Sequence, residues 1–93
     1  MAVLMEIEYP GVTAEQYDDL TGLIGTRSGQ RIAGLLSHAA IVTDEGLRVV
    51  DVWESPEAME AFLPKLRPAQ ESLGFPPPTA PPRLSPVHAF FPA

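Results

Sequence analysis

The sequence predicts an α+β fold of the ferredoxin-like type, in which a four-stranded antiparallel sheet carries both helices on one face. The first observation is the order of segments, since strand-like and helix-like stretches follow one another as βαββαβ. The second is a short turn between the two middle strands, which fits a hairpin. The third is the length of 93 residues with 45% hydrophobic residues, which predicts one domain over residues 1–93. Two split βαβ units with right-handed crossovers give this sandwich.

The first half of the chain begins with a strand and continues into a helix. Residues 3–9 alternate apolar and acidic side chains, a period of two that is typical of a half-buried strand. Thr13 and Gln16 have the spacing of a capping box. Apolar residues at helical spacing then run to Gly25, a natural helix end. These residues are Tyr17, Leu20, Leu23 and Ile24.

The middle of the chain predicts a hairpin followed by the second helix. The apolar run 32–42 and the run 47–53 flank a turn that ends at a glycine, so they are expected to pair antiparallel. Ser55 is a good N-cap for a helix that follows it. Pro64 and Pro68 each lack an N–H, so this helix is expected to be kinked or split, with a short second piece to about Leu73.

The C-terminal part is predicted to be a stiff connection and then a strand. Residues 75–86 are rich in proline, which favours an extended connection long enough to cross the molecule. A proline-rich ligand for a recognition domain is a second interpretation of the same residues. Residues 87–91, VHAFF, are the predicted last strand.

Charge and composition exclude several classes of function. Twelve acidic against six basic residues give a net charge of −6, which disfavours binding to nucleic acid and to anionic membranes. Without cysteine the chain has no disulfide and no thiolate chemistry. No apolar run reaches the roughly 18 to 20 residues of a membrane span. We therefore expect a cytoplasmic protein.

The two middle strands are apolar on both faces, which predicts a homodimer. In the third strand Val50 and Val52 point one way, and Val49 and Trp53 point the other. In the second strand Leu36 and Val42 are expected on one face, opposite Leu35 and Ile41. Two helices cover only one face of such a sheet, and a bare apolar face is more than monomers usually expose. The simplest cover is a second copy of the sheet packed face to face.

Four stretches carry a resemblance to a known family: PGVTAEQYDDL, GLLSHAA, DVWESPEAMEAF and SPVHAFF. Together they cover nearly the whole chain, which resembles the dimeric α+β barrel superfamily. It is similar in particular to small actinobacterial proteins of the antibiotic-biosynthesis-monooxygenase-like type. The resemblance implies a small-molecule pocket between helices and sheet. Members include cofactor-independent oxygenases, haem-degrading enzymes, isomerases and proteins without known activity.

The resemblance also bears on cofactors. In the haem-degrading branch the pocket is lined by a tryptophan after the third strand, an asparagine on the first strand and a histidine on the second helix. Trp53 matches the tryptophan, but residues 3–9 contain no asparagine and residues 63–70 no histidine. We therefore expect no haem, and no other cofactor.

Four residues form the predicted substrate-binding set. Asp51 and Trp53 share one face of the third strand, which the resemblance turns toward the pocket. A buried carboxylate needs a partner or a wet cavity, so Asp51 is either a pocket group or a sheet-margin residue bonded to Arg48 or a backbone amide. Trp53 is either a pocket wall or plain core. Tyr17, whose hydroxyl is expected to enter the cavity or to reach water, and Phe62, from the apolar stripe of the second helix, complete the set.

His38 and His88, the only two histidines, are the predicted catalytic residues. A histidine exchanges a proton near neutral pH, which suits a base in substrate deprotonation. In the expected sheet the second and fourth strands lie at opposite edges, so the two imidazoles meet only across a dimer interface, if at all. Each is alternatively an ordinary hydrogen-bonded edge histidine. Two histidines without a third ligand make a poor metal site, so no metal is expected.

Two functions remain open from the sequence. The first is a cofactor-independent oxygenase or isomerase acting on a small aromatic or polyketide-like molecule, with a histidine as base and Trp53 stacked on the ring. The second is a non-catalytic dimeric protein that binds a ligand or has a structural role. Fold alone does not choose between them.

Overall fold

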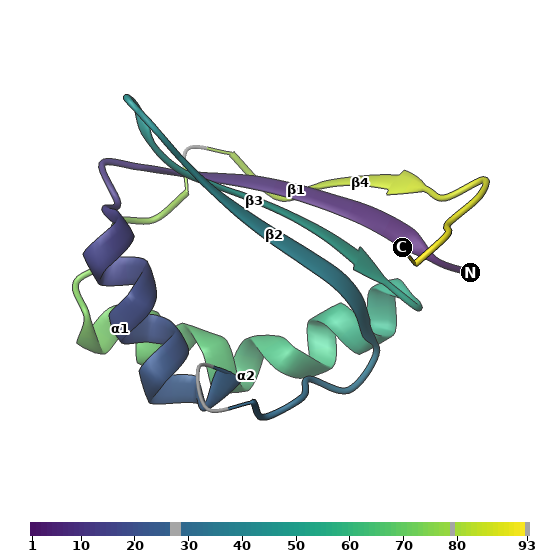
Figure 1. Cartoon of the computed structure of the whole chain (residues 1–93), viewed down its shortest axis with the longest axis horizontal. Coiled ribbons are helices and arrows are strands. Elements are labelled where there is room, and N and C mark those ends of the chain that lie inside the picture. The colour runs from purple at the N-terminus through teal and green to yellow at the C-terminus, as the bar shows by residue number, and fades with distance from the viewer. Residues whose placement is uncertain (27–28, 79, 93) are drawn as a thin grey trace.

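A computed structural model describes residues 1–26, 29–78 and 80–92 and confirms the predicted fold class. The sheet has the strand order β2-β3-β1-β4, with all pairs antiparallel. Both helices cover the same face of the sheet (Figure 1). The elements are β1 (Val3–Pro10), α1 (Ala14–Ile24), β2 (Leu35–Thr43), β3 (Gly46–Trp53), α2 (Pro56–Ser72) and β4 (Arg83–Pro86).

The helix ends follow the predicted capping residues. The Gln16 N–H donates to Thr13 Oγ1 at 3.1 Å and the Thr13 N–H donates to Gln16 Oε1 at 3.0 Å, so the capping box is complete. Gly25 ends α1 with φ 92°, the left-handed region that favours glycine. Ser55 caps α2 by accepting the Ala58 N–H at 3.1 Å. These caps fix where each helix leaves the sheet.

The expected split of the second helix is wrong, because α2 continues through both prolines to Ser72. Each proline removes one N–H and leaves the carbonyl four residues earlier without its usual donor. Those carbonyls belong to Glu60 and Pro64, which lie on the exposed side of the helix where water can satisfy them. The packing of the opposite, apolar side then holds the helix together.

The last strand also differs from the prediction. β4 lies at Arg83–Pro86, inside the predicted connection, and residues 87–91 form no strand. It pairs with the first half of β1, and the Val87 N–H adds one bond to Ala2 O at 3.0 Å. A proline is tolerated in an edge strand because its missing donor is not needed by a second neighbour. Residue 79 of the predicted connection lies outside the described residues.

The register of the sheet determines which side chains face the helices. Met5 pairs with Asp51 and Val3 with Trp53, and these residues face the helices as predicted. A β-bulge between residues 35 and 37 shifts the start of β2, so Leu35 pairs with Trp53 and packs on the helix side. The expected placement of Leu35 opposite Val42 is therefore wrong, since one extra residue reverses the alternation of faces.

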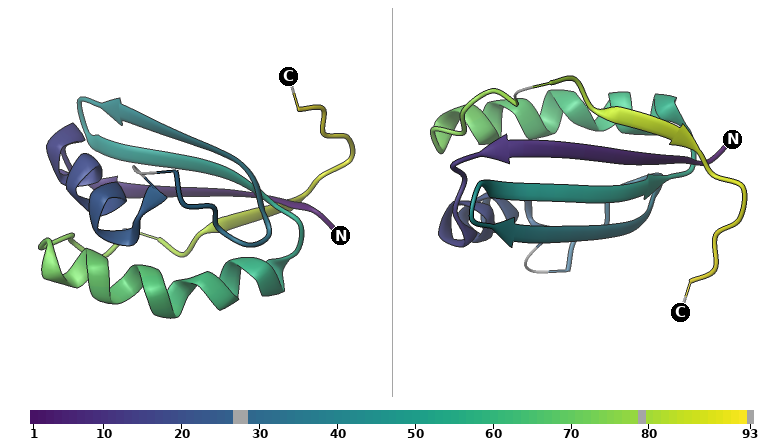
Figure 2. Two further views of the ribbon diagram at one scale, coloured as in Figure 1. Left: turned by 60° about the horizontal axis from the view of Figure 1, so that its bottom comes forward. Right: turned by 90° about the horizontal axis from the view of Figure 1, so that it is seen from above.

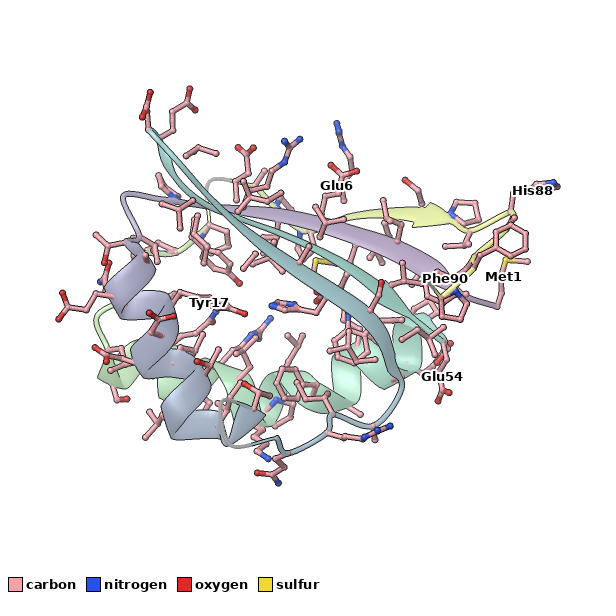
Figure 3. All side chains as sticks on the ribbon, viewed as in Figure 1. Met1, Glu6, Tyr17, Glu54, His88 and Phe90 are labelled. Carbon is pink, nitrogen blue, oxygen red and sulfur yellow. The ribbon has the colours of Figure 1, made fainter. Side chains whose placement is uncertain are left out.

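The opposite face of the sheet carries no helix (Figure 2). Glu6 points out from it, and Ile41 is 43% exposed (Figure 3). Its centre contains Val50, which pairs with both Glu6 and Ala39. Within the described residues no helix is long and apolar enough to cross a membrane. The cytoplasmic location stays a prediction.

Candidate functional site

A cavity of about 930 Å³ lies between the helix-covered face of the sheet and the two helices. This volume is near the upper end of the range for pockets that hold small organic molecules. Its wall is mainly apolar and comes from β1, β3, α1 and α2. Among its lining residues are Met5, Ile7, Leu20, Val49, Met59 and Leu63. A few polar groups interrupt this wall, which is the usual composition of a small-molecule site.

Three of these polar groups form a hydrogen-bonded chain. The Tyr17 hydroxyl lies 2.5 Å from His38 Nε2, and His38 Nδ1 lies 2.5 Å from Asp51 Oδ1. The three residues come from α1, β2 and β3, and His38 and Asp51 are direct partners across the hairpin. Figure 3 shows Tyr17 pointing from α1 into the space between helix and sheet. The structure thus brings together three of the residues predicted from the sequence.

The Tyr17 phenol can act as a donor at one end of this chain. Burial raises the pKa of the Tyr17 phenol above its usual range, and the negative charges of Asp51 and Asp18 raise it further. The phenol therefore keeps its hydrogen near neutral pH and is able to donate it to His38 Nε2. In the tautomer with its hydrogen on Nδ1, His38 accepts this bond at Nε2 and donates to Asp51. The basic lone pair at Nε2 thus faces the Tyr17 oxygen at the border of the cavity.

Burial differs sharply along this chain. The Asp51 side chain is 8% exposed, whereas the His38 side chain is 34% exposed. The carboxylate is thus a fixed, buried partner, and the imidazole is the group that a ligand can reach. The expected alternative partner of Asp51 is wrong, because Arg48 projects from the other face and lies 3.8 Å from Glu6 and from Glu8.

Trp53 and Phe62 form an aromatic part of the cavity wall. Trp53 is 2% exposed, and its ring centroid lies 5.9 Å from that of Phe62 at an angle of 39°. Trp53 belongs to the buried core and also lines the cavity, so both interpretations from the sequence hold at once. Its Nε1–H has no hydrogen-bond partner among the described residues. A buried donor without a partner is costly, so this group lowers the stability of the fold.

The two predicted catalytic histidines are not together. His88 is exposed, follows β4 and points away from the helices and the cavity (Figure 3). β2 and β4 occupy opposite edges of the sheet, as the sequence predicted. The cavity lining contains His38 but not His88.

Sequence reasoning missed Tyr9 and Gln70 as cavity residues. Gln70 Nε2 donates to the Tyr9 hydroxyl at 3.1 Å, and both side chains line the cavity. The two residues are 61 positions apart, so only the packing of α2 on β1 brings them together. The one available signal is that Tyr9 shares the inward face of its strand with Met5 and Ile7.

Metal ligands are not grouped in the described part of the chain. No cluster of three or more histidine, cysteine, aspartate or glutamate side chains occurs there in a geometry that could hold an ion.

Comparison with solved structures shows that this architecture occurs in other proteins. A protein described as a candidate antibiotic biosynthesis monooxygenase from Chloroflexus aurantiacus J-10-fl superposes with a TM-score of 0.66 at 19% identity, covering 98% of each chain. A mutant form of SnoaB, a cofactor-independent oxygenase from Streptomyces nogalater, superposes with a TM-score of 0.59 at 17% identity, covering 99% of this chain and 96% of SnoaB. No protein-family model and no curated protein matches the sequence. The chain therefore shares the fold of antibiotic-biosynthesis-monooxygenase-like proteins.

Proposed function

We propose that this protein is a cofactor-independent enzyme that removes a proton from a small aromatic or polyketide-like substrate and acts as an oxygenase or an isomerase. The observation that carries the proposal is the chain Tyr17–His38–Asp51, whose imidazole borders an apolar cavity. A base oriented by a buried carboxylate is a common arrangement for general base catalysis.

The proton would move along the observed hydrogen bonds. An acidic C–H or O–H of the substrate approaches the Tyr17 oxygen, and Tyr17 passes its own hydrogen to His38 Nε2 as it takes the substrate proton. The Asp51 carboxylate stabilises the imidazolium that forms. The substrate is left as an enolate or carbanion, to which the Tyr17 hydroxyl can donate a hydrogen bond. The apolar wall keeps water from reprotonating it.

Two outcomes follow from this common intermediate. In an isomerase, His38 returns the proton to a different carbon. In an oxygenase, the carbanion reduces dioxygen and forms a C–O bond to it, which gives an alkyl peroxide anion; this anion takes the proton from His38 and becomes a hydroperoxide. Loss of water then converts the original CH₂ to a carbonyl, so that CH₂ and O₂ give C=O and H₂O. The oxygenase outcome is supported by the shared fold with SnoaB, which is described as a cofactor-independent oxygenase.

Anthrone is a suitable probe because its CH₂ is acidic and its three rings are apolar. Deuterium exchange at that CH₂ without oxygen measures proton removal alone, and oxygen consumption in air measures the complete reaction. His38→Gln is expected to lower the exchange rate about 10²- to 10⁴-fold, the usual contribution of a general base. His88→Asn is the matched histidine control and should leave the rate unchanged.

The alternative function is binding of a ligand without catalysis. The cavity supports this second candidate, because it can hold a small molecule whether or not a reaction follows. Saturable binding of anthrone, with no enzyme-dependent exchange and no oxygen uptake, would support that function. An exchange rate that falls equally in the His38 and His88 variants would contradict the role given to His38. Exchange without oxygen uptake would select the isomerase.

The open face of the sheet supports a further part of the proposal, a homodimer formed by packing this face on a second copy. Ile41 and Ala39 on β2 and Val50 on β3 provide an apolar strip, and the ion pair of Arg48 with Glu6 lies beside it on the central strands. His38 faces the helices, on the other side of the sheet. A partner stacked on the open face therefore buries apolar surface and leaves each cavity to its own chain.

A further inference from the structure

The Tyr9–Gln70 pair is a second polar feature of the cavity that the proton-transfer chain does not use. Gln70 Nε2 donates to the Tyr9 hydroxyl at 3.1 Å, and Tyr9 is 8% exposed. The Phe75 ring packs edge-on against the Tyr9 ring, with centroids 5.7 Å apart at 71°. The Phe75 N–H donates to Gln70 O at 3.0 Å, so the turn after α2 holds the glutamine and the aromatic ring in place. The pair is thus rigid and built from three parts of the chain.

The pair has hydrogen-bonding capacity left over. Tyr9 accepts one bond from Gln70, and its own hydrogen has no acceptor within the described residues. Turning the Gln70 amide by 180° would exchange the roles, and an amide hydrogen would then be free instead. Burial is the main cause that raises the pKa of Tyr9, so the phenol keeps its hydrogen near neutral pH. Either way the pair offers a donor to the cavity.

This donor lies at a distance from the reacting groups. Along β1, Met5 is the partner of Asp51 and Tyr9 is the partner of Leu47. Four residues of strand separate these positions by about 13 Å between Cα atoms, from a rise of about 3.3 Å per residue. The wall between them is apolar and includes Ile7 and Val49. A ligand that touches both features is therefore apolar in the middle and polar at two points.

We propose that the Tyr9–Gln70 pair is a specificity-determining contact that binds a carbonyl oxygen of the substrate, remote from the carbon that loses its proton. The ligand class is an apolar aromatic ketone, because the pair offers one hydrogen-bond donor in a mainly apolar wall. The role in the reaction rests on the function proposed above, whereas the binding contact stands on its own. Without an oxygen at this point a ligand leaves the Tyr9 donor buried and unpaired, which penalises hydrocarbon analogues.

The test compares anthraquinone with anthracene, which have the same three-ring shape and differ in carbonyl oxygens. Binding is followed by quenching of Trp53, the single tryptophan, which lines the cavity. The wild-type protein should bind anthraquinone about 3- to 10-fold more tightly, the value of one neutral hydrogen bond. Tyr9→Phe should reduce this ratio to about one. Thr21→Val is the matched control in the same cavity and should keep the ratio, because the Thr21 hydroxyl already donates to Asp18 O within α1.

A second variant and a kinetic readout separate the possible failures. Gln70→Leu should also reduce the ratio, because it removes the partner that orients the Tyr9 phenol. This variant tests the same contact if the Tyr9→Phe protein does not fold. With anthrone, Tyr9→Phe should raise KM by a similar factor and leave kcat within about twofold. If anthrone is not turned over but the binding ratio falls in both variants, the contact stands and the proposed enzyme does not. A wild-type protein without preference, or natively folded variants that keep it, would overturn the contact.

Discussion

Removing the His38 imidazole should lower the free energy of unfolding, because it leaves the buried Asp51 carboxylate without its hydrogen-bond partner. Asp51 is 6% exposed and accepts a hydrogen bond from His38 Nδ1 at 2.5 Å. A hydrogen bond to a charged group contributes about 1.5–3 kcal/mol. Since the imidazole is a third exposed, water from the cavity can replace part of that bond. We therefore expect His38→Ala to lower the free energy of unfolding by about 1.5–2 kcal/mol, the lower end of that range.

The decisive comparison adds Asp51→Asn to His38→Ala. A neutral amide is cheaper to leave buried than a carboxylate, so the double variant should be more stable than His38→Ala alone. The single Asp51→Asn variant keeps an acceptor for His38 and should lose less than about 1 kcal/mol. The two effects are therefore non-additive, with a coupling energy between residues in direct contact.

Urea denaturation of the four proteins at neutral pH measures this cycle. In a domain of this size each 1 kcal/mol corresponds to roughly 4–8 °C in Tm, so thermal melting gives an independent check. His88→Asn, at an exposed position, should match the wild type. If His38→Ala is as stable as the wild type, or if the double variant is the least stable of the four, the inferred His38–Asp51 bond is refuted.

Three further predictions concern Trp53, the tyrosines and the open sheet face. Trp53→Phe should lower stability by about 1–2 kcal/mol, because the smaller ring leaves a void in the core, and it should weaken anthraquinone binding measured by calorimetry; an unchanged affinity would remove Trp53 from the site. The pKa values of Tyr9 and Tyr17 are raised in the folded state above about 10, the value in the unfolded chain. The resulting contribution to stability is fully present below about pH 10 and is lost as the pH rises through the pKa values of the folded state. The Tm of Tyr9→Phe and of Tyr17→Phe should therefore fall less steeply with rising alkaline pH than the Tm of the wild type. Equal slopes of Tm against pH in the wild type and both variants would contradict this prediction. Light scattering at micromolar concentration should give twice the mass of one chain for the wild type, and a mass closer to that of one chain for Ile41→Glu. A soluble wild-type monomer would refute the dimer.

The order and faces of the strands could be predicted because they depend on local pattern. The period-two alternation of residues 3–9 and the caps at Thr13 and Ser55 are decided within a few residues of sequence. The same alternation places Asp51 and Trp53 on one face of their strand, and the resemblance turns this face toward the helices; the register of β3 with β1 confirms both. Where a structural element depends on neighbouring residues and competing interactions are weak, the sequence pattern is sufficient to predict that element.

The errors have a common cause, which is that packing outweighs a local signal. Pro64 and Pro68 predict a break, yet α2 continues because its apolar side is held against the rest of the protein. Residues 87–91 have the composition of a final strand, but β1 pairs with Arg83–Pro86 instead. The bulge before Ser37 has no recognisable sequence signature, and it turns Leu35 to the other face.

The candidate site shows the same limit at the level of single contacts. Asp51, His38 and Tyr17 could each be named from sequence, since each is an unusual residue in its own segment. Their connection could not be named, because it depends on the register of β2 with β3 and on the position of α1 above the sheet. His38 opposite Asp51 is a consequence of the hairpin, which pairs the two residues directly. Tyr17 reaches them only because α1 begins at its capping box and therefore presents that side chain toward the edge strand.

This arrangement also explains why a protein this acidic can keep a carboxylate as part of a base. Asp51 is separated from the acids of the outer face by the sheet itself, where Arg48 lies near Glu6 and Glu8. On the inner face its hydrogen-bond partner is His38, and the next group along the chain of bonds is the neutral phenol of Tyr17. In the proposed mechanism an imidazolium at His38 would face one buried carboxylate, which is 8% exposed. In the proposed mechanism the buried acid, the accessible imidazole and the phenol form the sequence of groups that takes up one proton and returns it.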